Sequence, residues 1–254
     1  NMEINLKKIA IVLSLTSLFF KTNVFAQKFE NKYVNNNGVS LTEKEYEFVN
    51  NFYGDNFFKN MTEEDLEWIS DLDVNNRKVE ISTTYDSQLG NVKLGPRKSQ
   101  TLYEFNKKIT IANSCIDNSC TIITNLTWLV DPSNKSYDVI GARMFGVTYD
   151  DSEIVTKLIS SNGTQWFTNN NFQSSGFGTS VKLPENASNI RIEQKFVTNS
   201  GGTVYASYQH STSIISSSTS SQYLINASGL GGVFQFYGSA SGKFDGMSGV
   251  NITL

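Results

Sequence analysis

From Val79 to Leu254, apolar and polar residues alternate with a period of two in one segment after another. Runs such as "VEISTTY", "CTIITNLTWLV" and "NIRIEQKFVT" follow this pattern and are rich in β-branched residues, which is typical of strands with one buried face. Gly, Asn, Asp and Ser cluster between the runs, as tight turns require. The pattern predicts a mainly β fold, with an antiparallel β-sandwich over residues 79–254.

Residues 41–78 have a different pattern, which predicts a short N-terminal helical segment that caps the sandwich. Ser40 followed by Glu43 is typical of a capping box, and Gly54 can end this first helix. Thr62 is the expected N-cap of a second helix, because acidic residues follow it at the positive end of the helix dipole. The helical cap is therefore expected to be separate from the strands that follow.

The beginning of the chain has the features of a secretion signal. Lys7 and Lys8 precede an apolar run over residues 9–20, and Val-Phe-Ala up to Ala26 is typical of a cleavage site. The apolar run is too short to cross the roughly 30 Å of hydrocarbon in a bilayer. We therefore expect a signal peptide over residues 1–26, a flexible lead-in over residues 27–40 and an extracellular location.

The chain contains only two cysteines, Cys115 and Cys120, and both lie between β-branched runs. If these runs pair as a hairpin around residues 116–119, the cysteines face each other, one face is mostly apolar and the other mostly polar. An oxidising compartment preserves such a pair as a disulfide, which stabilises a loop this short by about 2 kcal/mol. A redox or metal-binding pair is the alternative, but the spacing is not CxxC and no histidine cluster accompanies it. The pattern predicts a structural disulfide.

The charges of the chain and its few candidate catalytic residues restrict the classes of function that are possible. The chain has 21 Lys and Arg against 24 Asp and Glu, and no basic stretch typical of nucleic-acid binding. His210 is the only histidine, whereas a Ser-His-Asp or zinc site needs more than a lone imidazole. Asp138 and Glu193 are acids suited to glycoside cleavage, but the sequence does not give their separation. A secreted carbohydrate-active hydrolase is an alternative, and we assign no catalytic residue.

One acidic loop has some features of a calcium site. In "DLDVNN", Asp71, Asp73 and Asn75 match the first, third and fifth positions of a calcium-binding loop, whereas Ser82 stands where the bidentate Glu belongs. The other interpretation is a polar helix exit into the first strand. Calcium is the only cofactor that the sequence suggests.

The C-terminal region is poor in charge and rich in Ser, Thr, Gly and aromatic residues. Residues 203–226 are a candidate for the stem of a β-pore-forming protein, which hides its backbone polar groups in a closed barrel. This alternative predicts a long hairpin or a pinned loop, and leakage of dye from liposomes. The Ser-rich part alternates poorly, however, and ordinary sandwich strands with a polar loop explain it as well.

Four stretches of the chain resemble blocks in small secreted proteins of Gram-positive bacteria whose function is not established. These stretches are "FYGDNFFKNMTEEDLEWISDLDV", "SYDVIGARMFG", "GTVYASYQHS" and "FDGMSGVNITL". The resemblance implies secretion and one shared architecture. It implies no activity and no functional residues.

These features favour a secreted, non-enzymatic interaction or envelope-associated protein. A neutral surface rich in hydroxyls and aromatics binds a glycan or a surface protein by stacking and hydrogen bonding. The candidate contact residues lie in "SNGTQWFTNNNFQSSGFG" and are Trp166, Phe167, Phe172 and Phe177. Packing of Trp166 and Phe167 into the core is the competing interpretation, and solvent exposure distinguishes the two. A membrane partner is expected only for the pore-forming alternative.

Overall fold

The computed structural model describes residues 32–87, 105–228, 232–246 and 248–254. The predicted signal peptide and the first five residues of the lead-in lie outside these ranges. The longest helix in the described ranges is α2 (Glu43–Phe52), and none of the helices there combines the length and the apolar character that crossing a bilayer requires.

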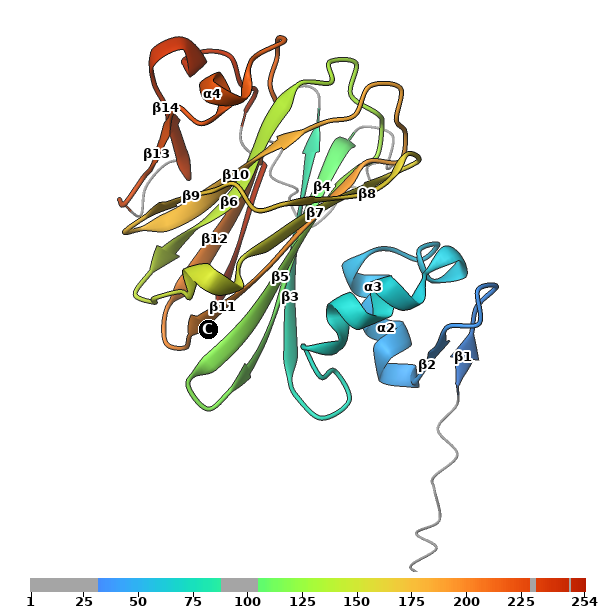
Figure 1. The fold of residues 1–254 in the computed structure, drawn as a ribbon. Coiled ribbons are helices and arrows are strands. Elements are labelled where there is room, and N and C mark those ends of the chain that lie inside the picture. The colour runs from blue at the N-terminus through green and yellow to red at the C-terminus, as the bar shows by residue number, and fades with distance from the viewer. Residues whose placement is uncertain (1–31, 88–104, 229–231, 247) are drawn as a thin grey trace, which may run out of the picture.

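Two antiparallel sheets make up most of the molecule (Figure 1). The first, which we name the β6 sheet, contains β6 (Tyr137–Phe145), β9 (Asn170–Gln173), β10 (Gly176–Lys182), β12 (Thr203–Gln209) and β15 (Ser248–Thr253), in the order β15–β12–β6–β10–β9. The second, the β5 sheet, contains β3 (Val79–Ser87), β4 (Phe105–Ile116), β5 (Ser119–Trp128), β7 (Val155–Ser160), β8 (Gly163–Phe167) and β11 (Arg191–Asn199), in the order β3–β4–β5–β11–β7–β8. The predicted mainly β, antiparallel class is confirmed.

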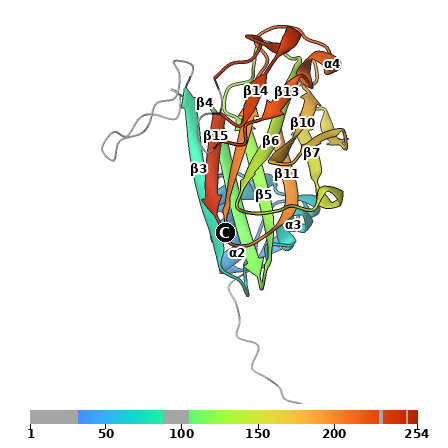
Figure 2. The same ribbon diagram turned by 90° about the vertical axis from the view of Figure 1, so that its left-hand side faces the viewer.

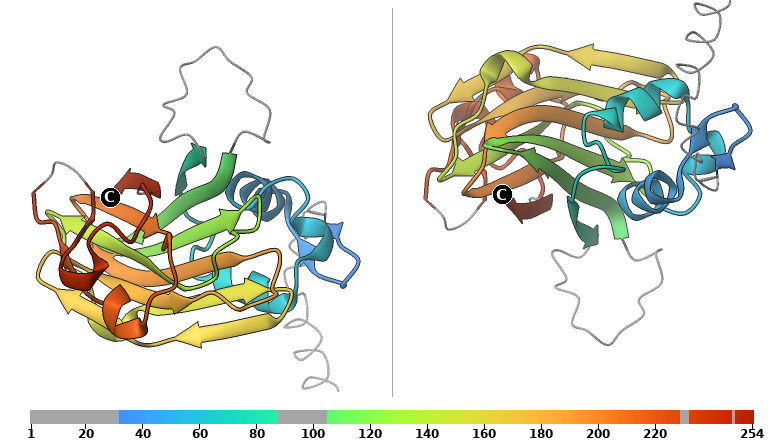
Figure 3. Two further views of the ribbon diagram at one scale, coloured as in Figure 1. Left: turned by 90° about the horizontal axis from the view of Figure 1, so that it is seen from above. Right: turned by 90° about the horizontal axis from the view of Figure 1, so that it is seen from below.

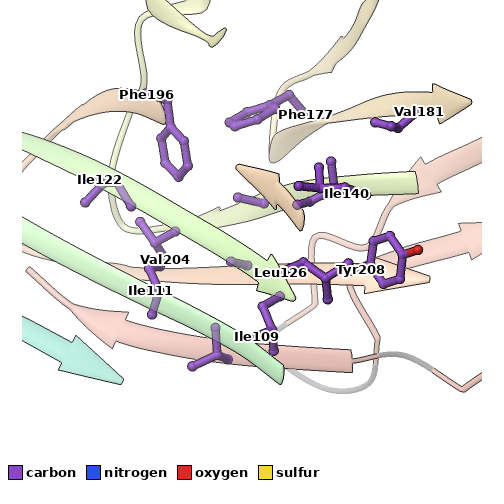
Figure 4. Packing of buried hydrophobic residues seen from close by; sticks show 14 of the residues in the cluster. Ile109, Ile111, Ile122, Leu126, Ile140, Phe177, Val181, Phe196, Val204 and Tyr208 are labelled. Atoms are coloured by element: carbon purple, nitrogen blue, oxygen red, sulfur yellow. The ribbon is translucent and has the colours of Figure 1, made fainter. Parts of the chain in front are cut away.

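The main hydrophobic core lies between these two sheets. Alternate residues of the inner strands of both sheets point into it, as the period of two requires. Figure 4 shows Ile111, Ile122 and Leu126 of the β5 sheet close to Ile140 and Val204 of the β6 sheet. All five side chains are fully buried. Burial of this apolar surface is the dominant stabilising contribution to a fold of this kind.

The hairpin that carries the cysteines forms in the predicted register. Cys115 faces Cys120, Ile111 faces Thr124, and a disulfide joins the two cysteines. The turn is tighter than predicted, because Ile116 and Ser119 are themselves paired and only residues 117 and 118 lie outside the strands. The structural disulfide is confirmed.

The prediction that this hairpin has one polar, solvent-facing side is wrong. Ala112 and Ile123 point away from the main core, yet they are fully buried in a second cluster with apolar residues of the helical segment. Thr110 and Asn125 on the same side are also fully buried. The local alternation of the strands gives no information about a helical layer that packs on their second face.

This helical layer consists of α2, η1 (Phe58–Asn60) and α3 (Glu63–Ser70), and it lies against the β5 sheet (Figures 1 and 3). Thr62 is the N-cap of α3, as predicted, and Asp65 completes its capping box. The N-cap of α2 is Thr42 with Glu45, so the prediction of Ser40 and Glu43 is wrong. The two residues of the observed capping box have the predicted spacing of three, but they lie two positions later in the chain than predicted.

The described part of the predicted flexible lead-in is a small hairpin. Strands β1 (Tyr33–Val34) and β2 (Ser40–Leu41) pair with each other, which explains why Ser40 is not a cap. The Asn35 side chain donates to the carbonyl oxygens of Phe58 and Met61 at 2.8 Å and 2.7 Å. These bonds fix the hairpin on the helical layer.

A small C-terminal unit covers the outer face of the β6 sheet at the other side of the molecule (Figures 2 and 3). It contains α4 (Ser217–Ser220), β13 (Tyr223–Ile225), β14 (Phe234–Phe236) and η4 (Gly238–Ala240). Tyr223 packs so closely on Gly178 that a Cβ at this glycine would lie 2.4 Å from the Tyr223 hydroxyl. A side chain larger than hydrogen at residue 178 would therefore displace this unit.

Residues 203–226 do not form the long hairpin expected of a pore-forming stem. Their first part is β12, which lies inside the β6 sheet between β15 and β6. Their second part is a loop with α4, followed by β13, which pairs with β14 and not with β12. The loop is held by a hydrogen bond of 2.8 Å from the Ile215 backbone N–H to the Ser136 hydroxyl. The pinned loop that this alternative also allowed is therefore present, but the paired stem is not.

Candidate functional site

Strand β8 forms one edge of the β5 sheet, and four of its five residues are exposed. Trp166 has 55% of its surface exposed, and its ring centroid lies 5.9 Å from that of Trp68 on α3. The Nζ of Lys157 lies 4.3 Å from the Trp68 ring centroid and 5.6 Å from that of Trp166. An ammonium group so close to aromatic rings is attracted to their faces. Trp166 is therefore an exposed aromatic side chain that packs beside Trp68 and Lys157.

Ion pairs join the β5 sheet to α3 close to this edge. Glu193 is fully buried, and its carboxylate lies 3.4 Å from Lys157 Nζ and 2.9 Å from Arg191 Nε. Asp65 of α3 pairs with Arg191 Nη2 at 2.6 Å. Burial disfavours the guanidinium charge, but the carboxylates of Glu193 and Asp65 outweigh it and raise the pKa of Arg191. Burial is the main cause that raises the pKa of Tyr53, beside this cluster, well above its ordinary value.

The four candidate contact aromatics fall into two groups. Trp166 and Phe172 are 55% and 43% exposed, as a contact role requires. Phe167 is partly buried and packs against the main core, and Phe177 is fully buried within it. Phe177 is therefore not a surface contact residue, because β10 lies inside its sheet whereas β9, which carries Phe172, lies at the edge. A contact role for Trp166 and Phe172 stays a prediction.

The three predicted calcium ligands each have another partner. Asp71 pairs with Lys195 Nζ at 2.7 Å, and Asp73 pairs at 3.4 Å with the guanidinium four residues later. The Asn75 side-chain oxygen accepts a hydrogen bond of 2.7 Å from the Thr42 hydroxyl. In the described ranges, no group of three or more His, Cys, Asp or Glu side chains is placed to hold a metal ion. Calcium binding stays a prediction, and it would require these contacts to break.

A second polar cluster closes one end of the main core. Asp138 on β6 is fully buried and accepts hydrogen bonds from the Tyr208 hydroxyl and, at 2.9 Å, from the Ser211 backbone N–H. His210 Nδ1 lies 3.0 Å from both Asp138 carboxylate oxygens. Burial, followed by the charge of Asp138, raises the pKa of Tyr208 well above its ordinary value. The Trp128 indole N–H donates to the Tyr208 hydroxyl at 3.1 Å.

Lys107 and Asp245 extend this cluster. Lys107 is 3% exposed, and its Nζ lies 2.5 Å from Asp245 and 5.4 Å from the Trp128 ring centroid. Asp245 also accepts a hydrogen bond of 2.9 Å from the His210 backbone N–H. We name the set formed by Lys107, Trp128, Asp138, Tyr208, His210, Ser211 and Asp245 the closed-end network.

In the sequence His210 stands alone and this network is not evident, because Lys107, Asp138 and Asp245 are far from it in the chain. One signal was available. Asp138 is in phase with the inward-facing Ile140, and Tyr208 and His210 share a face two residues apart. The other acid considered for a catalytic pair, Glu193, lies on the outer side of the β5 sheet, beneath α3. Asp138 and Glu193 therefore do not converge on one site.

Comparisons with known proteins give only distant likenesses. No family model matches the chain, and neither does any curated protein. A structure described as the manganese lipoxygenase of Gaeumannomyces graminis with a partial zonadhesin of Komagataella pastoris is similar at 12% identity and a TM-score of 0.29. This match covers 39% of this chain and 39% of that chain, so this chain spans about two fifths of its length.

Two further similar structures are domains of bacterial surface proteins. The KRT10-binding region domain of the pneumococcal serine-rich repeat protein PsrP is 8% identical, over 53% of this chain and 86% of that chain, with a TM-score of 0.32. The collagen-binding subdomain of the Enterococcus faecalis surface protein ACE is 8% identical, over 54% of this chain and 87% of that chain, with a TM-score of 0.30. No function is transferred from likenesses of this strength.

Proposed function

We propose that this chain is a secreted or envelope-associated, non-enzymatic binding protein, built as a β-sandwich with a helical cap, that binds a glycan or protein partner outside the cell. The observation that carries the proposal is the exposed edge strand β8 with Trp166. Its sequence, "GTQWF", contains no charge and no proline. Natural sheets usually protect an exposed edge with charged residues or proline, because unpaired backbone groups attract other strands.

The two edges of the β5 sheet differ in this respect. Strand β3, at one edge, carries Glu80, and the Lys78 ammonium lies 2.5 Å from the Glu80 carboxylate. Strand β8, at the other edge, exposes Gln165 and Trp166 beside unpaired backbone groups. An extended segment of a partner protein can add to such an edge, with main-chain hydrogen bonds for affinity and Trp166 for side-chain contact. This geometry favours a protein partner at β8.

The test is capture of surface-protein extracts and of purified cell-wall glycans on the immobilised protein. We expect saturable binding of a protein component, which Trp166→Ser and Gln165→Lys both weaken. The matched control is Phe145→Ser, because Phe145 is 54% exposed and lies outside β8. Binding that survives both β8 substitutions would contradict the proposal, and release of dye from liposomes would instead support the pore-forming alternative.

A further inference from the structure

Lys107 is a buried lysine in direct contact with a carboxylate. It lies on β4 in phase with the core residue Ile109, and its Nζ lies 2.5 Å from Asp245 Oδ2. The centroids of the Trp128 and Tyr208 rings lie 5.4 Å and 5.6 Å from the same nitrogen atom. Both aromatic residues belong to the main core. The ammonium group therefore meets its carboxylate in mostly apolar surroundings.

Asp245 is held in one orientation by its neighbours on the chain segment 209–210. The Asp245 backbone N–H donates to the His210 carbonyl, and the His210 backbone N–H donates to Asp245 Oδ1, both at 2.9 Å. The Gln209 side chain donates to the Asp245 carbonyl at 2.9 Å. With Oδ1 occupied in this way, Oδ2 faces Lys107 Nζ. The carboxyl carbon, one bond beyond Oδ2, is therefore close to the roughly 3–3.5 Å that separates reacting atoms in a near-attack geometry.

The other lysine–carboxylate pairs within the described ranges lack either the burial or the close contact. Lys78 Nζ also lies 2.5 Å from a carboxylate oxygen, that of Glu80, but both side chains are exposed and their charges stay hydrated. Lys157 is fully buried, but the Glu193 carboxylate is 3.4 Å from its Nζ and also pairs with a guanidinium. Lys107 and Asp245 combine the short contact of the first pair with a lysine as buried as that of the second.

We propose that Lys107 and Asp245 condense to form an intramolecular amide bond. A proton moves from the ammonium to the carboxylate, which removes both charges from the apolar surroundings. The amine nitrogen then attacks the carboxyl carbon and forms the N–C bond, while the His210 backbone N–H stabilises the charge that develops on Oδ1. A second proton moves from the nitrogen to Oδ2, the bond from the carbon to Oδ2 breaks, and one molecule of water leaves.

The geometry and the surroundings favour the amide over the ion pair. Two reacting groups held in contact have an effective concentration far above that of free molecules, and a neutral amide avoids the cost of keeping two charges away from water. The Asp245 side chain is 27% exposed, so the water that forms has a path to solvent. The bond links β4 of the β5 sheet to the segment before β15 of the β6 sheet, and this link persists when the chain unfolds.

The experiment is the intact mass of the purified, folded full chain, followed by digestion and peptide mapping by tandem mass spectrometry. We expect a mass lower by one water molecule than the sequence and its disulfide require, and one branched peptide that contains residues 107 and 245. Lys107→Arg and Asp245→Ala each remove one reacting group and should abolish the loss of water. The mass of the unsubstituted chain decides the matter even if these variants fold poorly.

The matched control is Lys195→Arg. Lys195 Nζ lies 2.7 Å from Asp71, but the Asp71 side chain is exposed, so this pair should stay ionic and the variant should keep the loss of water. An unsubstituted chain that has lost only the two hydrogens of the disulfide would overturn the proposal. A loss of water that persists in Lys107→Arg would overturn it as well. Capture of a partner at β8 is a separate measurement and does not depend on this bond.

Discussion

The two ends of the main core are both polar, but they differ in how completely their polar groups are paired. At one end, Asp138 accepts from Tyr208 and Ser211 and contacts His210, while Lys107 pairs with Asp245. At the other end, the Thr198 hydroxyl is buried without a partner beside an open cleft. A paired network stabilises a fold, whereas a buried polar group without a partner lowers its stability.

This difference also changes how His210 is interpreted. A buried aspartate next to the Nδ1 of a histidine has the geometry of a catalytic pair. Here the same aspartate also binds Tyr208 and Ser211, and the His210 ring lies edge-on to Trp128 with centroids 4.9 Å apart. We therefore interpret the pair as a structural element that holds residues 208–211 against the core.

Asp138→Ala provides the strongest test of the closed end. The substitution leaves the buried Tyr208, His210 and Ser211 groups without their acceptor, so we expect the free energy of unfolding to fall by about 3–5 kcal/mol. Urea unfolding measures it. Asp151→Ala at the open end is the control and should change the value by no more than about 0.5 kcal/mol. Equal effects at both ends would contradict the comparison.

Reduction of the disulfide tests the open end. Loss of the Cys115–Cys120 bond should lower the free energy of unfolding by about 2 kcal/mol, because the unfolded chain regains the freedom of a short loop. Urea unfolding with and without dithiothreitol measures the effect, and the double variant Cys115→Ala, Cys120→Ala separates it from other effects of the reductant. If the urea concentration at the midpoint of unfolding does not change, contacts of the hairpin tip other than the disulfide are sufficient to hold it.

The pH dependence of stability provides a test that involves two neighbouring lysines on β4. Lys107 has a carboxylate partner, whereas Lys108 donates to the Phe52 carbonyl at 3.1 Å. Burial lowers the pKa of Lys108 to about 8, although Asp55 partly opposes this. Between this pKa and the ordinary value of 10.5, the unfolded chain binds more protons, so stability rises with pH.

The rise should be about 2 kcal/mol between roughly pH 7 and 9.5. Burial raises the pKa of Tyr53 and Tyr208, so these groups lower the stability again above about pH 10, where unfolded tyrosines ionise. Urea unfolding at several pH values measures the curve. Lys108→Met should flatten it, and a curve unchanged in this variant would refute the role given to Lys108.

The features that the sequence predicted are those that local spacing determines. The register of the hairpin follows from alternation over about twenty residues, and the N-cap Thr62 follows from its own helix. The features that it missed depend on contacts between distant segments. Burial of Ala112 requires the helical layer, Asp138 meets His210 across 72 residues, and the cleft joins residues 118, 148 and 198. The burial of Phe177 was missed because alternation does not show which strand is inside a sheet.

The smallest expected effect concerns the unpartnered hydroxyl. Thr198→Val removes a buried polar group that makes no hydrogen bond, so stability should stay the same or rise by about 1 kcal/mol. Thermal unfolding compares it with Thr124→Val, which should behave alike. A marked loss of stability in Thr198→Val alone would mean that its hydroxyl already has a partner, such as a bound water.

Amide hydrogen exchange followed by NMR tests the contrast between the two ends most directly. We expect the backbone N–H groups of His210 and Ser211, which donate to the Asp245 and Asp138 carboxylates, to exchange slowly, and Asp138→Ala to speed the exchange of Ser211. The backbone N–H groups of the exposed residues Asn118 and Asp151 at the open end should exchange quickly in both proteins. Equally fast exchange at both ends of the unsubstituted protein, or slow exchange at Ser211 in Asp138→Ala, would contradict the comparison.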